Sequence, residues 1–151
     1  MKTIFFIPAR GGSTRVKNKN LKKIDRTSIL AKKIKNCLAT KLGKVYVSTD
    51  SKKIAQISTN NGANILDLRP KSLSTSKSSM LSSIINFLEN YQKKYFSLPD
   101  FIILAPTTNP FLKKNSICQS IKVLKNKPLF NSIVSVSVSY THLTLPTKRI
   151  V

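Results

Sequence analysis

The sequence predicts an α/β fold in which helices flank a mainly parallel sheet. Short apolar runs alternate with segments that have helical spacing of apolar residues, which is typical of strand–helix–strand crossovers. The first run, Ile4 to Ile7, is continuously apolar, as expected of a strand buried on both faces of a sheet. A chain of 151 residues with 40% hydrophobic content is long enough for one domain with a real core. Ligands of such sheets bind beyond the carboxyl ends of the strands.

The segment after the first strand is predicted to bind a polyphosphate. The strand stops at Pro8, and Gly11 and Gly12 let the backbone turn tightly and approach a ligand, because neither carries a Cβ. Cations and hydrogen-bonding side chains crowd the same loop: Arg10, Arg15, Lys17 and Lys19, with Ser13, Thr14, Asn18 and Asn20 between them. The alternative is a basic surface turn, against which the two adjacent glycines argue. Neither a Walker loop nor a dinucleotide fingerprint is present, so the residues alone do not name the nucleotide.

A turn and a helix are expected next. Asp25 and Arg26 suggest the turn, and Thr27 or Ser28 can cap a helix that Gly43 ends. The apolar positions of this helix recur at helical spacing and are Ile29, Leu30, Ile34 and Leu38.

A second strand over residues 44–48 is rich in β-formers, and Asp50 follows it directly. Asp50 is either a functional carboxylate at a strand end or the N-cap of a helix over residues 52–60. We favour the cap, because a single Asp before a helix commonly has that role. Residues 63–66 are predicted to form a third strand.

The second half of the chain continues the alternation. A Ser/Lys-rich segment, residues 71–79, is interpreted as a flexible surface loop. A helix over residues 80–95 follows, then a fourth buried strand over 101–104 and a fifth strand over 132–136. The expected core face of the 80–95 helix consists of Leu81, Ile84, Ile85 and Leu88. A last helix contains Ile117, Ile121 and Leu124, with Ser116 as its expected cap.

The net charge of +22 results from 27 basic and only 5 acidic residues. Because the lysines are scattered through nearly every segment, we interpret the charge as a general attraction for anions and expect no dedicated nucleic-acid site.

Cys37 and Cys118 have neither metal-ligand spacing nor a disulfide pattern, so reduced, buried thiols are expected. No apolar run resembles a signal peptide or reaches the roughly 18 residues of a membrane span. A cytoplasmic protein is therefore predicted.

The glycine loop also resembles a family signature, that of the acylneuraminate cytidylyltransferases, or CMP-sialic acid synthetases. Their usual pattern is close to I-P-A-R-G-G-S-K-R-I-P-x-K-N, and it is matched by Ile7 to Ser13, Arg15, Lys19 and Asn20. Thr14 stands where the family commonly has Lys, and Lys17 where it commonly has Pro. Later segments also resemble the family: V-S-T-D at 47–50, L-R-P at 68–70 and A-P-T-T-N-P at 105–110. This chain departs from the family pattern at Ser76, Ala105 and Leu112, which replace a common Asp, Gln and Arg.

The resemblance implies a Rossmann-like nucleotide-diphospho-sugar transferase fold, truncated, and transfer of CMP from CTP to an acidic sugar of the N-acylneuraminate type. It implies catalytic roles for Arg10 and Lys19. The implied nucleotide-binding residues are Ala9, Gly11, Gly12, Ser13, Arg15, Asn20, Arg69, Ser78, Ser79 and Thr107. The family's Mg²⁺ ligands and dimer-forming segment lie in a C-terminal half, so the chain provides none of the metal ligands. We therefore predict weak CTP binding at best and no turnover by this chain, and a homodimer for the full-length protein.

Two alternative functions remain open. The acceptor sugar can instead be a legionaminic, pseudaminic or octulosonic acid. A rival of another class is a non-catalytic, basic nucleic-acid-binding module, which would need aromatic stacking residues in its basic patches; the glycine loop has none.

Residues 1–137 are predicted to be the N-terminal part of a catalytic domain. Residues 138–151, which include the single histidine His142, look like a translated sequencing-library adaptor and are predicted to be a non-native tail.

Overall fold

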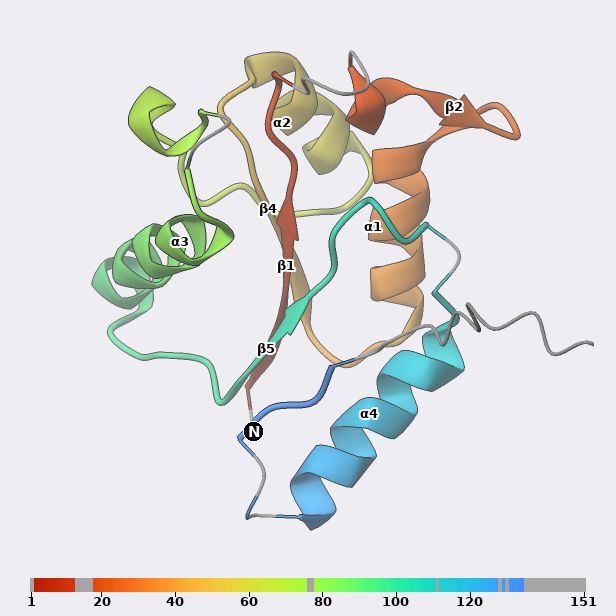
Figure 1. The fold of residues 1–151 in the computed structure, drawn as a ribbon, viewed down its shortest axis with the longest axis vertical. Helices are drawn as coiled ribbons and strands as arrows, with labels where there is room; N and C mark the ends of the chain where they lie inside the picture. Colours follow the sequence, from red (N-terminus) through yellow and green to blue (C-terminus); the bar gives the residue numbers. More distant parts are fainter. Residues whose placement is uncertain are drawn as a thin grey trace, which may run out of the picture.

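A computed structural model describes residues 2–12, 18–75, 78–110, 112–127, 129 and 131–134. Its centre is a three-stranded parallel sheet in which β1 (Thr3–Pro8) lies between β4 (Lys44–Ser48) and β5 (Phe101–Leu104) (Figure 1). The helices are α1 (Ile29–Ala39), α2 (Lys52–Asn60), α3 (Met80–Tyr95) and α4 (Lys114–Asn126). This architecture confirms the predicted α/β fold with a parallel sheet flanked by helices.

The side chains of β1 form the middle of two cores. Phe5 and Ile7 point to one face of the sheet and pack with residues of α1, α2 and α4. Ile4 and Phe6 point to the other face and pack under α3. All four are at most 1% exposed, because successive residues of a strand alternate between faces and both faces are covered here. The prediction of a strand buried on both sides is confirmed.

The three strands end at one edge of the sheet, where the chain segments that follow them meet. Pro8 is in register with Ser48, and Phe6 with Leu104. The ladder continues one step beyond the strands, since the Ala9 N–H donates to the Ser48 carbonyl at 2.9 Å and the Ala105 N–H to the Phe6 carbonyl at 3.0 Å. The loops after β1, β4 and β5 therefore begin side by side.

A small hairpin connects the first loop to α1. The 3₁₀ turn η1 (Lys19–Leu21) is followed by strands β2 (Lys23–Ile24) and β3 (Thr27–Ser28). Asp25 and Arg26 form the predicted turn between these strands, with φ values of 52° and 65°. Ser28 then caps α1, because its Oγ accepts the Ala31 N–H at 3.1 Å, and the helix ends at Ala39, four residues before Gly43.

Two predicted helix caps are wrong. Ser51, not Asp50, caps α2 by accepting the Ile54 N–H at 3.4 Å, since the carboxylate of Asp50 is engaged elsewhere. In α4 the N-cap position is Lys113, not Ser116. The Lys113 carbonyl accepts the N–H groups of Ser116 and Ile117 at 3.1 and 3.4 Å, so Ser116 already lies within the first turn.

The strand predictions for the outer parts of the sheet are only partly correct. Residues 63–66 form a single bridge, between Asn64 and Tyr46, instead of a strand. The described part of the expected fifth strand, residues 132–134, contains no strand, and residues 135–136 lie outside the described residues. The strand β5 is half-buried, with Leu104 43% exposed, because it forms an edge of the described sheet.

The buried face of α3 differs from the predicted one. Ser83, Phe87 and Tyr91 face the sheet, flanked by the partly buried Ile84 and Leu88. Leu81 and Ile85 are 65% and 48% exposed. The aromatic residues decide the orientation, since Phe87 and Tyr91 pack against Phe6 and Tyr46 of the sheet with ring centroids 5.0 to 5.6 Å apart.

Both cysteines are free, as predicted. Cys37 is fully buried in α1, and burial raises the pKa of its thiol to about 11. Cys118 is only half-buried, so the expectation of a buried thiol is wrong there. Among the helices that the structure describes, none is long and apolar enough to cross a bilayer.

Candidate functional site

The glycine loop is fastened to the end of β4. The N–H of Gly11 donates to Oδ1 of Asp50 at 2.7 Å. A Cβ on Gly11 would lie 3.2 Å from Cβ of Ser51 and 3.6 Å from Oδ1 of Asp50, so only glycine fits this close approach easily. Asp50 thus orients the loop after β1, which is a different role from the helix cap that the sequence suggested.

Asn20 and Thr107 join the first loop to the loop after β5. The Asn20 side chain donates from Nδ2 to the Arg10 carbonyl at 3.0 Å, and its Oδ1 accepts the Thr107 hydroxyl at 2.8 Å. Both side chains are only 4% exposed. Buried polar groups with satisfied hydrogen bonds hold their partners in one geometry. The structure therefore brings together three residues that the sequence proposed separately for one site.

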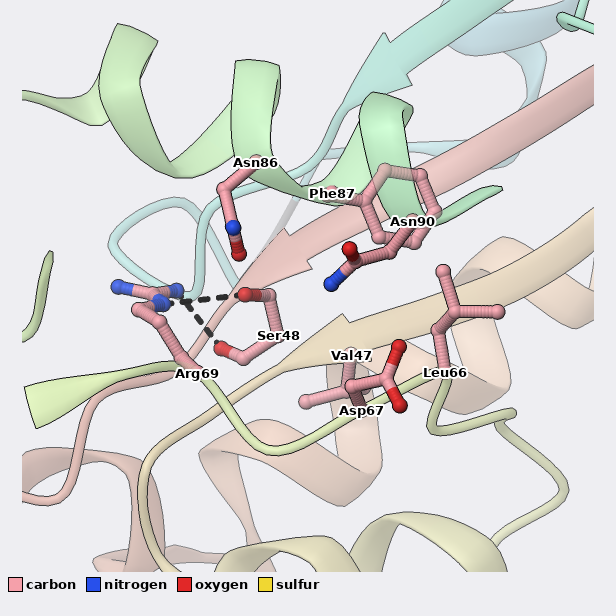
Figure 2. A pocket seen from close by; sticks show the side chains of 8 residues that line it. All are labelled: Val47, Ser48, Leu66, Asp67, Arg69, Asn86, Phe87 and Asn90. Carbon is pink, nitrogen blue, oxygen red and sulfur yellow. Dashed lines mark hydrogen bonds between the residues drawn. The ribbon is translucent and has the colours of Figure 1, made fainter. Parts of the chain in front are cut away.

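Arg69 lies buried beside the end of β4. Its Nε donates to Oγ of Ser48 at 3.0 Å and its Nη2 to the Ser48 carbonyl at 2.8 Å (Figure 2). Its backbone N–H donates to the Thr49 carbonyl at 2.8 Å. Burial lowers the pKa of the Arg69 guanidinium, Asp50 raises it, and the positive charge of Arg10 lowers it. A buried cation therefore stands next to the glycine loop.

The predicted catalytic cations lie in the described part of the same region. Arg10 is half-buried, and its Nη1 donates to the Thr75 carbonyl at 2.8 Å, which connects it to the loop before α3. Lys19 is half-buried at the start of η1. Ala9 is fully buried, whereas Gly12 is exposed with open space where a Cβ would stand. Ser13 and Arg15 lie outside the described residues.

The serines before α3 have structural partners. Ser79 is the N-cap of α3 and accepts the Ser82 N–H at 3.0 Å. The Ser78 hydroxyl donates to the Ser72 carbonyl at 2.8 Å and lies 2.7 Å from the Thr75 hydroxyl. These contacts, with the 3₁₀ turn η2 (Lys71–Leu73), give residues 71–75 and 78–79 local order that the sequence did not predict.

A shallow, open pocket lies between β4 and α3 (Figure 2). Arg69 and Ser48 line one side, Asp67 lines another, and Asn86 and Asn90 project from α3. Sequence reasoning missed Ser48, Asn86 and Asn90. The two asparagines are four residues apart and so share one helix face, which is the signal that could have identified them.

The described residues do not form a magnesium site. Among them, no group of three or more His, Cys, Asp or Glu side chains lies close enough to hold a metal ion. The carboxylate nearest the glycine loop, Asp50, already accepts the Gly11 N–H. Mg²⁺ prefers several carboxylate and water oxygens, and a single engaged carboxylate does not provide them.

The arrangement suits an anionic ligand. Arg10 lies two residues after β1, and Arg69 is hydrogen-bonded to Ser48, the last residue of β4. Lys19 directly precedes Asn20, which binds the Arg10 carbonyl, and the backbone of Gly12 is exposed. Guanidinium groups bind phosphate oxygens with directed, charge-assisted hydrogen bonds. Such an edge can hold and polarise a phosphate chain without any acid–base group.

Comparison of the sequence with known proteins identifies a family. A family model described as cytidylyltransferase matches residues 4–148. The chain is 32% identical over 138 residues to a CMP-N,N'-diacetyllegionaminic acid synthase of Legionella pneumophila, covering 91% of the chain and 58% of that protein. It is 33% identical over 139 residues to an N-acylneuraminate cytidylyltransferase of Escherichia coli, covering 91% of the chain and 32% of that protein.

Solved structures share the fold. A structure of CMP:2-keto-3-deoxy-manno-octonic acid synthetase with CTP is similar with a TM-score of 0.70 at 18% identity, over 85% of this chain and 49% of the other. A cytidylyltransferase from Leptospira borgpetersenii gives a TM-score of 0.63 at 23% identity, over 83% of this chain and 50% of the other. The chain thus spans about a third to three fifths of the length of these proteins. By its match to the family model over residues 4–148, the chain belongs to the cytidylyltransferase family.

Proposed function

We propose that the full-length protein containing this chain activates an acidic sugar with CTP, and that this chain supplies the nucleotide-binding edge. The anomeric hydroxyl of the sugar attacks the α-phosphorus of CTP. A phosphorus–oxygen bond to the sugar forms, and the bond to pyrophosphate breaks. The observation that carries the proposal is the hydrogen-bonded connection of Thr107, Asn20, Arg10, Gly11 and Asp50 at the strand ends.

The chain's own residues would act through charge and position. Arg10 and Lys19 would stabilise the negative charge that builds up on the phosphates during transfer, and we assign them the catalytic roles. Asn20 and Asp50 would hold the backbone of the loop in place by their bonds to Arg10 and Gly11. The residues proposed to contact the nucleotide are Ala9, Gly11, Gly12, Ser13, Arg15, Asn20, Arg69, Ser78, Ser79 and Thr107.

The acceptor belongs to the acidic sugars, and we propose the N-acylneuraminate type. Relatives named for legionaminic, N-acylneuraminic and pseudaminic acids are 30 to 33% identical to this chain over the matched residues. These identities are too similar to separate the sugars, so legionaminic, pseudaminic and octulosonic acids are the alternatives that the assay below must include.

Magnesium and dimerisation belong to the proposal for the full-length protein. Because the described residues do not fit a magnesium site, we propose that the metal ligands lie in the part of the relatives' length that this chain does not span. The same holds for the homodimer contacts. The prediction of no turnover by this chain alone, the cytoplasmic location and the non-native tail over 138–151, which lies outside the described residues, remain predictions.

The test is recovery of the uninterrupted gene and an assay of pyrophosphate release by its product. We expect release with CTP plus an acidic nine- or eight-carbon sugar, and none when ATP, GTP or UTP replaces CTP. A neutral sugar in place of the acidic one is the matched control. Release that does not depend on the sugar, or that is equal with ATP, would contradict the proposal. RNA retained on a filter and not displaced by CTP would instead support the nucleic-acid-binding alternative.

A further inference from the structure

A buried lysine on α1 stands out because nothing in the proposed chemistry uses it. Lys33 is only 1% exposed, although lysine is rarely buried so completely. It lies among the apolar residues of α1 that face the sheet, between Leu30 and Ile34 in the helical pattern. The loop that follows β5 passes beside this helix (Figure 1).

The ammonium group of Lys33 is bound to that loop. Its Nζ donates to the carbonyl of Asn109, 76 residues away in sequence. Burial lowers the pKa of Lys33, while the neighbouring Cys37 has a smaller, raising effect. Burying a charged group is costly unless it gains hydrogen bonds in return. Burial of the Lys33 charge therefore costs free energy, which the hydrogen bond to the Asn109 carbonyl offsets only in part.

A second side chain of α1 makes the same kind of contact. Asn36, three residues after Lys33 and so on a neighbouring part of the helix surface, donates from Nδ2 to the carbonyl of Leu112. The two donors thus bind carbonyls at positions 109 and 112 of one loop. A single contact would leave the loop free to rotate, whereas two contacts fix its direction.

The loop that α1 binds in this way carries a site residue. Its start is fixed to the sheet by the bond from the Ala105 N–H to the Phe6 carbonyl at 3.0 Å, and its end by Lys33 and Asn36. Thr107 lies between these anchors and donates to Asn20, which in turn donates to the Arg10 carbonyl. Hydrogen bonds, together with the backbone between residues 107 and 109, therefore connect α1 to the backbone of the glycine loop.

We propose that Lys33 and Asn36 are positioning residues for the nucleotide site: they hold the loop after β5 so that Thr107 aligns Asn20, and Asn20 the Arg10 backbone. The inference rests on the proposed function, since it concerns the geometry of the same nucleotide site. If Lys33 had a purely structural role, it would stabilise the fold, and its loss would not change the affinity for CTP through Thr107.

The experiment is a double-mutant cycle on CTP affinity in the full-length protein, measured by calorimetry with magnesium present. Lys33→Met keeps the aliphatic stem and removes the donor, and Thr107→Val removes the hydroxyl but keeps the shape. We expect each single variant to raise the Kd for CTP about tenfold. The Kd of the double variant should match those of the single variants within about twofold, because the effects of substitutions within one hydrogen-bond network are not additive. Lys35→Met, an exposed position of the same helix, is the matched control and should leave the Kd unchanged.

The outcomes separate this inference from the proposed function. An unchanged Kd in Lys33→Met, or effects of Lys33→Met and Thr107→Val that multiply in the double variant, would overturn the positioning role alone. No CTP binding by the unmodified protein would overturn the proposed function and this inference together. If urea unfolding shows that Lys33→Met does not fold, Asn36→Ala replaces it in the cycle, because Asn36 is only half-buried. The Kd values of Asn36→Ala and of its double variant with Thr107→Val then test the positioning role in the same way.

Discussion

Replacing Gly43 with Ala is expected to destabilise the fold by about 3 kcal/mol, at the upper end of the usual cost of overpacking. A Cβ at this position would lie 1.8 Å from the carbonyl oxygen of Thr3 and 2.6 Å from its carbon. These are backbone atoms of the central strand, so no side chain can rotate away to make room. The start of β1 must move, and its pairing with β4 and β5 moves with it.

Urea unfolding of the full-length protein measures this effect. The matched control is Gly12→Ala, because a Cβ on Gly12 would meet nothing within 4 Å. The control should change the free energy of unfolding by less than about 0.5 kcal/mol, as surface substitutions usually do. Equal urea midpoints for the two variants would show that Gly43 does not pack against β1 as described.

Arg69→Met is expected to weaken CTP binding about a hundredfold, equivalent to about 2.7 kcal/mol and typical of a lost hydrogen bond to a charged group. Its stability is expected to change little. The folded state holds the Arg69 charge against the cost of burial, which lowers its pKa, and removing the charge removes that cost. The Ser48 carbonyl still accepts the Ala9 N–H at 2.9 Å after the substitution.

Calorimetry for affinity and urea unfolding for stability are both needed for this variant. Arg26→Met is the control, since Arg26 is exposed in the β2–β3 turn and lies outside the proposed site. Arg26→Met should leave the Kd for CTP within about twofold, because exposed charges contribute little. Loss of stability in Arg69→Met with unchanged CTP affinity would assign Arg69 to the fold and not to the nucleotide.

Several elements could be predicted from the sequence because their signals are local. The apolar run of β1 and the helix over residues 52–60 depend on neighbouring residues alone, and both are found where expected. The same is true of the Asp25–Arg26 turn and of the Ser28 cap. Within such short segments, side-chain type and spacing are sufficient.

The contacts of Asp50 could not be predicted in this way. Asp50 and Ser51 are both good capping residues, and the sequence does not distinguish them. The choice follows from the sheet, because pairing of β1 with β4 brings Gly11 to the end of β4. The N–H of Gly11 then donates to the carboxylate of Asp50, which is 39 residues away in sequence. Ser51 is then left to cap α2.

The hydrogen bonds from Lys33 and Asn36 of α1 to the loop after β5 also join residues that are far apart in sequence. Asn20 and Thr107 could each be assigned to the site, but their mutual hydrogen bond depends on β5 lying next to β1. Lys33 did carry a signal that sequence analysis passed over. It falls three residues after Leu30 on the apolar face of the helix, where a lysine needs a partner.

Calorimetry of CTP binding, with magnesium, to the full-length protein after Arg10 and Lys19 are both changed to Ala tests the central claim most directly. The matched control changes Lys22 and Lys23 to Ala, two exposed cations just beyond η1. We expect the Arg10/Lys19 variant to bind CTP about 30-fold more weakly than the control. Two charge-assisted contacts with the phosphates are lost, and each contributes less than that of the buried Arg69, because Arg10 and Lys19 are only half-buried. Equal affinities of the two variants would contradict a nucleotide site built on this loop.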